Sequence, residues 1–219
     1  MARDDVESVL SHRLRSSTQD AHRSAERSAF MRGLLGGALS TEDYRAFLDC
    51  LLTIYTALEA QLRRNAANSA VACVFDPRLE RVEALARDLD ALGDTRPGPL
   101  PEARAYAAHL EGLGDDAPER LVAHAYVRYL GDLSGGQLLD PIVQRSVPGA
   151  AETGRSFYAF GDVWTVRQLA AHLREGLDRI ANAYHDAIVD EAQIAFDMHA
   201  TLFAALEDQR SSRIDRMRS

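Results

Sequence analysis

The stretch Leu121-Val-Ala-His-Ala-Tyr-Val-Arg-Tyr-Leu-Gly-Asp-Leu-Ser-Gly-Gly-Gln137 decides how the rest of the chain is interpreted. Its apolar spacing, with Pro118 in a first-turn position just before it, predicts an ordinary amphipathic helix. However, Gly131, Gly135 and Gly136 all stand within six residues of that helix. Each glycine inside a helix costs roughly 1 kcal/mol relative to alanine, so three of them together need a physical reason.

Two interpretations of these glycines are open. They could end the helix, with Gly135 or Gly136 in a left-handed cap, although residues 137–144 still have a helical pattern. Alternatively, a flat and bulky group approaches the backbone, and a Cβ atom would collide with it. Gly131 and Gly135 are four residues apart and therefore share one face of a helix. This interpretation predicts a kinked helix that is bare on one side, with the Asp132 carboxylate beside the bare strip.

The composition favours a single globular domain. The chain has 219 residues, of which 46% are hydrophobic and 26% charged, and no low-complexity linker divides it. A net charge of −8 argues against non-specific nucleic-acid binding. No apolar run approaches the length of a membrane span, so we expect no membrane anchor. The two cysteines, Cys50 and Cys73, have no metal-binding spacing, and we expect buried thiols in a cytoplasmic protein.

Hydrophobic periodicity predicts helices along the whole chain and no alternating strand pattern, so the expected class is all-α. Residues 146–164 lack a clear period and are expected to form an apolar loop. Residues 1–206 would form the domain, and the polar, arginine-rich residues 207–219 would form a frayed tail. The expected helices cover roughly residues 5–24, 30–37, 41–65, 77–93, 102–113, 119–145, 165–183 and 186–206.

A second candidate site lies in the first of these helices. His22 follows Arg15 by seven residues, which is two helical turns and therefore the same face. A neutral imidazole is a good iron ligand, and a histidine is a common way for a protein to hold the iron of a heme group. An arginine on the same helix face could then bind a propionate of that heme. The ordinary alternative is a surface or half-buried helix histidine. The chain has seven histidines, and spacing alone does not choose among them.

Residues 121–137 closely resemble the signature of the heme oxygenase family, nearly residue for residue. Residues 14–31 resemble a second family segment at matching spacing, with Arg15 where many members carry lysine, and the resemblance covers roughly residues 8–206. It implies an all-α, single-domain bundle with heme sandwiched between the first helix and a kinked, glycine-rich distal helix. It also implies that dioxygen and supplied electrons convert heme into biliverdin, carbon monoxide and ferrous iron, so that heme is both substrate and cofactor.

The resemblance assigns roles on the proximal side of the heme. It implies that His22 is the proximal iron ligand and that Glu26, one turn on, either orients the imidazole or caps the helix locally. Arg15 and Tyr126 would anchor the heme propionates, and Phe196 would lie against the heme.

The third propionate anchor is open between Arg174 and Arg167. The family shows a Tyr-Arg-x-x-Leu/Met-Asn pattern, which residues 173–178 fit with leucine in place of tyrosine. A shifted register makes Arg167 the match instead. We favour Arg174. Because anchoring decides which ring carbon meets the bound oxygen, the biliverdin isomer also stays open, with the α isomer as the default.

On the distal side, the resemblance implies that the three glycines form the wall over the heme. Asp132 would not touch iron but would organise water that delivers protons to dioxygen. The ordinary interpretation of Asp132 is an ion pair with Arg128 one turn earlier, worth about 0.3–0.5 kcal/mol, which does not explain a carboxylate among glycines. Tyr55 and Arg128 are candidates for the outer part of the water network, although each could equally be a packed aromatic or a surface charge.

Two further histidines are expected to be structural. His124 lies inside the signature and should pack under the distal helix. His199 stands where relatives commonly have asparagine, and we expect a polar core position and not a second iron ligand.

Electrons would have to come from another protein, because the sequence contains no flavin, nicotinamide or iron–sulfur motif. An acidic ferredoxin with its reductase, or a flavin reductase, would suit arginines around the heme edge. One alternative is a non-catalytic heme chaperone or sensor, which would not need Asp132 among glycines. Another is a helical enzyme for thiamin-like or quinone-precursor substrates, which would need a nucleophilic cysteine or a carboxylate cluster, and neither Cys50 nor Cys73 has such neighbours.

Overall fold

The computed structural model describes residues 9–93, 96–147, 150 and 154–218, and every regular element in these ranges is a helix. The predicted all-α class is therefore confirmed. The α-helices are α1 (Leu10–Glu26), α2 (Ala29–Leu35), α3 (Thr41–Arg64), α4 (Val71–Val74), α5 (Val82–Ala91), α6 (Pro101–Asp116), α7 (Leu121–Ala125), α8 (Gly131–Ser146), α9 (Val163–Asp178) and α10 (His185–Arg218). Short 3₁₀ turns are η1 (Pro77–Leu79), η2 (Pro118–Arg120), η4 (Ser156–Tyr158) and η5 (Asn182–Tyr184), and η3 (Tyr126–Leu130) is a π-helix.

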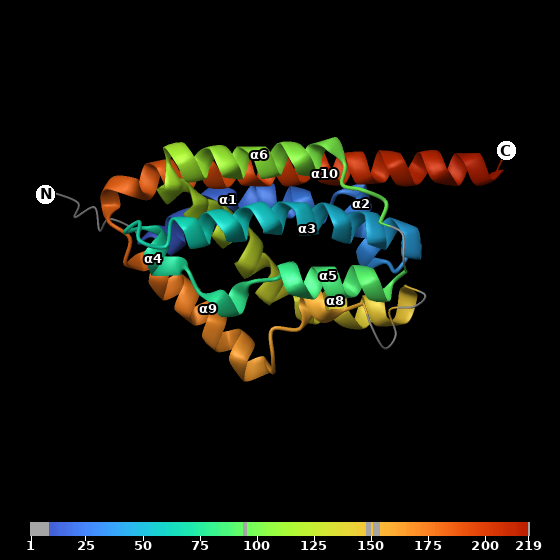
Figure 1. Ribbon diagram of the computed structural model, residues 1–219, viewed down its shortest axis with the longest axis horizontal. Helices are drawn as coiled ribbons and strands as arrows, with labels where there is room; N and C mark the ends of the chain where they lie inside the picture. Colours follow the sequence, from blue (N-terminus) through green and yellow to red (C-terminus); the bar gives the residue numbers. More distant parts are fainter. Residues whose placement is uncertain (1–8, 94–95, 148–149, 151–153, 219) are drawn as a thin grey trace, which may run out of the picture.

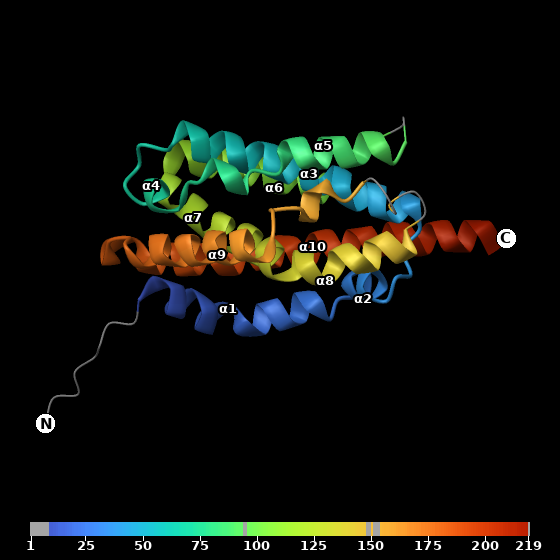
Figure 2. The same ribbon diagram turned by 90° about the horizontal axis from the view of Figure 1, so that it is seen from below.

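The helices form three layers (Figures 1 and 2). Figure 2 shows α1 and α2 on one side, α8, α9 and α10 in the middle, and α3, α4, α5 and α6 on the other side. The long α10 contacts α1 and α2 on one side and α6 and α7 on the other, so it joins the outer layers. Helix α10 therefore contacts both α1 and the α7–η3 part of the signature segment.

The central helix α3 begins at Thr41, in agreement with the expected helix over residues 41–65. Ser40 accepts a hydrogen bond from the backbone N–H of Asp43, and the Asp43 carboxylate accepts one from the Ser40 N–H, which completes a capping box. Beyond this start, one side of α3 is buried in the core and carries Tyr44, Leu48, Leu51, Ile54, Tyr55 and Leu58.

The expected start at residue 77 of the helix over residues 77–93 is wrong. Asp76 and Pro77 begin only the short turn η1, and α5 starts later, at Val82. The cause is the buried carboxylate of Glu59, which accepts hydrogen bonds from the backbone N–H groups of Arg81 and Val82. A carboxylate at this point satisfies the free N–H groups of a helix start and its positive dipole end.

The expected frayed tail is also wrong, because residues 207–218 continue α10 as helix. Arg213 forms ion pairs with Asp43 and, at 2.8 Å, with Glu42 at the acidic start of α3. Arg210 donates to the backbone carbonyl of Ala38. The arginines that made this segment look like a tail therefore hold it against α2–α3; residue 219 lies outside the described ranges.

The signature segment runs on through its glycines. Helix α7 passes into the π-helix η3, and α8 then continues from Gly131 through Pro141 to Ser146. The interpretation of the glycines as a helix end is therefore wrong. The predicted irregularity takes the form of the π-helical turn, a feature that re-aims side chains within a helix.

Candidate functional site

A cleft separates α1 from the η3–α8 segment and has two adjoining parts. The outer part has a volume of about 640 Å³ and the inner part about 310 Å³, sizes typical of ligand pockets. The residues that line both parts are His22, Val127, Gly131, Ser134 and Phe196.

His22 forms the wall of the cleft on α1, and its side chain is 54% exposed. Its Nδ1 atom lies 3.7 Å from Oε1 of Glu26, one turn later, which is too long for a hydrogen bond but close enough for a charge interaction. The Phe196 ring packs edge-on against the imidazole, with 6.0 Å between the centroids. Because Glu26 approaches Nδ1, the Nε2 atom is the one suited to bind a ligand.

The outer part of the cleft gathers the predicted anion-binding groups. Arg15 on α1, Tyr126 on η3 and Arg174 on α9 all line it. The hydroxyl groups of Thr18 and Tyr126 are 3.5 Å apart and link α1 to η3. Arg167 is exposed on α9 and does not line either part of the cleft. Of the two alternative anchors, the structure thus brings only Arg174 to the cleft.

The opposite wall is bare at two of the three glycines. A Cβ atom built on Gly131 or Gly135 would meet nothing within 4 Å, so both backbone positions face open space. A Cβ on Gly136 would lie 3.5 Å from the Tyr158 side chain. Gly136 therefore packs against Tyr158, and Gly131 and Gly135 provide the open strip.

Asp132 lies beside this strip at the centre of a buried hydrogen-bond network. Its carboxylate accepts hydrogen bonds from the Tyr55 hydroxyl and, at 3.1 Å, from Nη2 of Arg128. Nε of Arg128 donates to the Tyr55 hydroxyl at 3.2 Å, and Nη1 lies 2.7 Å from Nε2 of His199. His199 is held in turn by the backbone carbonyl of Ala195, 2.7 Å from its Nδ1. Side chains of α3 and η3 thus hold the Asp132 carboxylate, and α10 holds Arg128 through His199.

Burial sets the protonation of this network. It lowers the pKa of Arg128 to about 10, so the guanidinium stays charged at neutral pH. It also lowers the pKa of His199 well below the ordinary value, so a neutral Nε2 can accept from Arg128. Burial raises the pKa of Asp132 well above that of an ordinary aspartate. A carboxyl group of this kind can hold and release a proton beside the open strip.

A family model described as heme oxygenase matches residues 8–205, which include both walls of the cleft. The chain belongs to the heme oxygenase family. Heme oxygenase 2 of Synechocystis is 35% identical over 208 residues, covering 91% of this chain and 83% of that protein. Human heme oxygenase 1 is 32% identical over 214 residues, covering 94% of this chain and 74% of that protein.

Solved heme oxygenase structures share the fold. The crystal structure of Synechocystis heme oxygenase-1 in complex with heme superimposes with a TM-score of 0.86 at 30% identity, covering 96% of this chain and 97% of that chain. The heme oxygenase of Leptospira interrogans gives a TM-score of 0.84 at 31% identity, covering 90% of this chain and all of that chain (100%). Across the described ranges, no helix of this family member has both the length and the apolar character that crossing a bilayer requires.

Some features of the site went beyond the sequence predictions for this heme oxygenase family member. Tyr55, expected in the outer part of a water network, contacts Asp132 directly. The ion pair between Arg128 and Asp132, which is the ordinary interpretation of Asp132, is present at 3.1 Å. Ser134 and Tyr158 line the inner part of the cleft and were not predicted. Ser134 carried a usable signal, because it follows Gly131 by three residues and so shares its face. Tyr158 belongs to the segment predicted only as an apolar loop.

His124, which was not expected to bind the heme iron, lies outside the cleft. It is fully buried, with Nδ1 at 2.8 Å from the Tyr106 hydroxyl and Nε2 at 3.0 Å from Glu191.

Proposed function

We propose that this chain binds heme in the cleft between α1 and η3–α8 and, with dioxygen and supplied electrons, cleaves it to biliverdin, carbon monoxide and ferrous iron. One observation carries the proposal: an exposed imidazole on one wall faces a cleft whose other wall is bare at two glycines beside a hydrogen-bonded carboxyl group. A non-catalytic heme carrier would need the first wall but not the second.

The residues of the cleft fit a heme group. Open space at Gly131 and Gly135 suits the approach of a flat ring to the helix backbone, and arginines at one end suit its carboxylates. Bound heme would supply both the iron at which dioxygen is activated and the ring carbon that is oxidised.

On the proximal wall, His22 would hold the iron through Nε2. Glu26 would orient the ring from the Nδ1 side. Phe196, packed edge-on against the ring, would limit its rotation.

At the outer part of the cleft, Arg15, Tyr126 and Arg174 would bind the propionates. Arginine pairs with carboxylates through two parallel hydrogen bonds, which fixes orientation as well as position. Because the arginines come from different helices, α1 and α9, they would fix how the ring is rotated in its plane. We propose that this orientation gives the α isomer.

On the distal wall, Asp132 would exchange protons with water in the cleft. Tyr55 and Arg128 would hold its two carboxylate oxygens in place, so that the group does not have to reorganise during the reaction. Gly131 and Gly135 would leave room for that water next to the ring.

The electron donor would dock at the outer rim of the cleft, where Arg15, Arg23 and Arg174 lie. This positive rim suits an acidic ferredoxin, and a flavin reductase is the other candidate donor. Cys50 and Cys73 are free thiols, in keeping with a protein of the reducing cytoplasm.

The test of the proposal is turnover. The purified chain is mixed with hemin, ferredoxin, ferredoxin reductase and nicotinamide cofactor in air, with a ferrous-iron chelator present. We expect the heme absorption band to be replaced by that of biliverdin, with iron captured by the chelator. A stable heme complex that never yields biliverdin would contradict catalysis and favour the carrier or sensor.

A further inference from the structure

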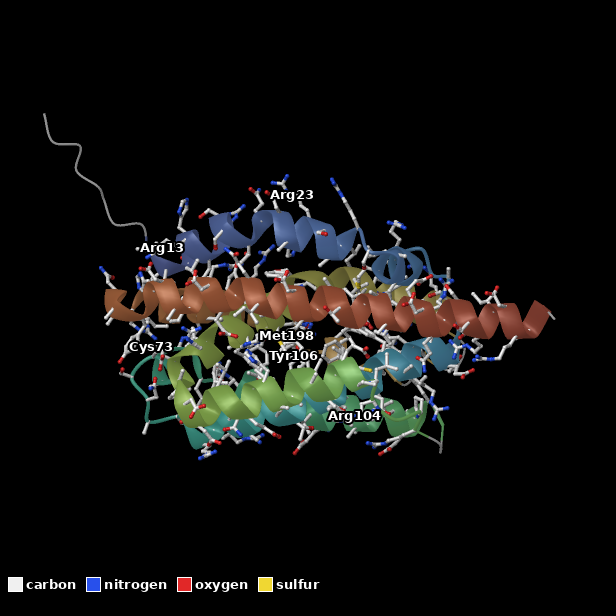
Figure 3. The ribbon with its side chains drawn as sticks, turned by 90° about the horizontal axis from the view of Figure 1, so that it is seen from above. Arg13, Arg23, Cys73, Arg104, Tyr106 and Met198 are labelled. Atoms are coloured by element: carbon white, nitrogen blue, oxygen red, sulfur yellow. The ribbon has the colours of Figure 1, made fainter. Side chains whose placement is uncertain are left out.

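A second cluster of chemically active side chains lies away from the cleft, where α6, α7 and α10 meet. His109 comes from α6, His124 from α7 and Glu191 from α10, and none of them lines the cleft. Oε1 of Glu191 is 2.6 Å from Nε2 of His109 and 3.0 Å from Nε2 of His124. Figure 3 shows the neighbouring Tyr106 on α6, between the ribbons of α6 and α10.

We infer that His109, His124 and Glu191 form a binding site for a divalent transition-metal ion of the zinc type. Their three donor atoms all lie within 4.8 Å of one another. Zinc bonds of about 2.0–2.2 Å in a tetrahedron place neighbouring donors roughly 3.3 Å apart, so small side-chain shifts would seat the ion. Two imidazoles with one carboxylate are a donor set that zinc and similar borderline ions prefer, with water completing the shell.

The surroundings of the cluster support such a site. The hydroxyl of Tyr106 lies 2.8 Å from Nδ1 of His124, so it can accept a hydrogen bond from that nitrogen while Nε2 binds the metal. His124 and Glu191 are buried, whereas the His109 side chain is 30% exposed and gives the ion a way in from solvent. Arg120, 3.2 Å from Oε2 of Glu191, is 35% exposed and can swing outward when a cation arrives.

Hydrogen bonds hold the cluster together even without an ion. Glu191 accepts from both imidazoles and from Arg120, so the donor atoms are already gathered before the metal binds. A preorganised site of this kind does not have to pay for ordering its ligands. The ligand atoms of His109, His124 and Glu191 lie close enough together to hold a metal ion. Among the histidine, cysteine, aspartate and glutamate side chains of the described residues, this is the group of three that does so.

Metal binding by His109, His124 and Glu191 would stabilise the distal wall from outside the cleft. Helix α7 leads directly into η3, which carries Arg128, and α10 carries His199, the partner of Arg128. An ion that joins α6, α7 and α10 would therefore fix the two elements between which Arg128 is held. The inference does not depend on heme binding or on turnover.

The test uses the heme-free full chain, without an affinity tag, after removal of metals by a chelator. Zinc is titrated by calorimetry, and cobalt(II) serves as a spectroscopic probe of tetrahedral nitrogen and oxygen ligands. We expect one zinc per chain, a tetrahedral cobalt spectrum, and a thermal midpoint raised by at least about 2 °C with saturating zinc.

Three variants separate a metal site from a hydrogen-bonded cluster. His109→Ala removes one ligand, and His109→Gln keeps a hydrogen-bond donor toward Glu191 but not the imidazole. Both should weaken zinc binding by at least about tenfold, since even indirect partners of a metal contribute that much. His172→Ala removes an exposed histidine outside the cluster and should bind zinc like the parent chain. Absence of stoichiometric zinc binding, or equal binding by both His109 variants and the parent, would overturn the inference.

Discussion

The two walls of the cleft are built in opposite ways. On α1, His22 is 54% exposed and stands 3.7 Å from its acidic neighbour Glu26. On the other wall, Arg128 is only 8% exposed and joins Asp132, Tyr55 and His199 in one hydrogen-bond network. The proximal wall thus keeps a nitrogen available for a new bond, whereas the distal wall already holds its carboxyl group by hydrogen bonds from neighbouring side chains. The contrast suggests that one wall supplies binding and the other supplies chemistry.

The largest effect is expected on the exposed wall. His22→Ala should abolish the native heme spectrum and turnover. Among the described residues, the other imidazole that lines the inner part of the cleft is His199, which is held by Arg128, and His12 lines only the outer part. Added imidazole should partly restore both properties. The matched control His172→Ala changes an exposed histidine on α9 and should behave like the parent chain. An unchanged spectrum in His22→Ala would reassign the iron ligand.

The distal wall should show the converse behaviour. Asp132→Ala should still bind heme with a histidine-ligated spectrum, but biliverdin formation should fall by about 100-fold or more, the range typical for loss of a proton-transfer group. Single-turnover absorption spectra measure both quantities. Asp90→Ala, which changes a 72% exposed carboxylate on α5, is the control. Normal biliverdin yield in Asp132→Ala would remove Asp132 from the mechanism.

The buried network should also be visible in stability. His199→Leu removes the acceptor for Nη1 of Arg128 and should lower the free energy of unfolding by about 1–3 kcal/mol, the usual cost of an unsatisfied buried polar group. His199→Asn keeps a side-chain acceptor and should cost less. Urea unfolding of the heme-free chain measures both. Equal losses for the two variants would mean that volume, and not the hydrogen bond, matters at this position.

The open strip at Gly131 and Gly135 predicts that a single variant will gain stability and lose heme affinity. Gly131→Ala should raise the free energy of unfolding of the heme-free chain by up to about 1 kcal/mol, because alanine favours helix, while weakening heme binding. Gly112→Ala in α6 is the matched control, since its Cβ also meets nothing within 4 Å. It should raise stability without changing heme affinity. If Gly131→Ala left heme affinity unchanged, the strip would not be part of the heme site.

The smallest effect concerns orientation. Arg174→Ala should change the ratio of biliverdin isomers, measured by chromatography, because Arg174 lines the cleft. Arg167→Ala should leave the ratio unchanged, because Arg167 does not line either part of the cleft. The reverse result would restore the alternative register.

Much of this structure could be predicted from the sequence because its signals are local. Helix periodicity, the Ser40–Asp43 capping box and the glycine spacing all depend on residues within one or two turns. The late start of α5 depends on Glu59, far away in sequence, and the helical C-terminus depends on Arg213 meeting the start of α3. Likewise, Tyr55 reaches Asp132 only through tertiary packing. Contacts of this kind leave no periodic trace in the sequence.

The most direct test of the two-wall account is a crystal structure of the heme complex. The account predicts iron bonded to Nε2 of His22, Gly131 and Gly135 on the opposite face of the ring, and propionates directed toward Arg15 and Arg174. It also predicts that the hydrogen bonds among Asp132, Arg128 and Tyr55 are the same with and without heme. Iron bonded to another residue, or a distal network that forms only when heme binds, would contradict it.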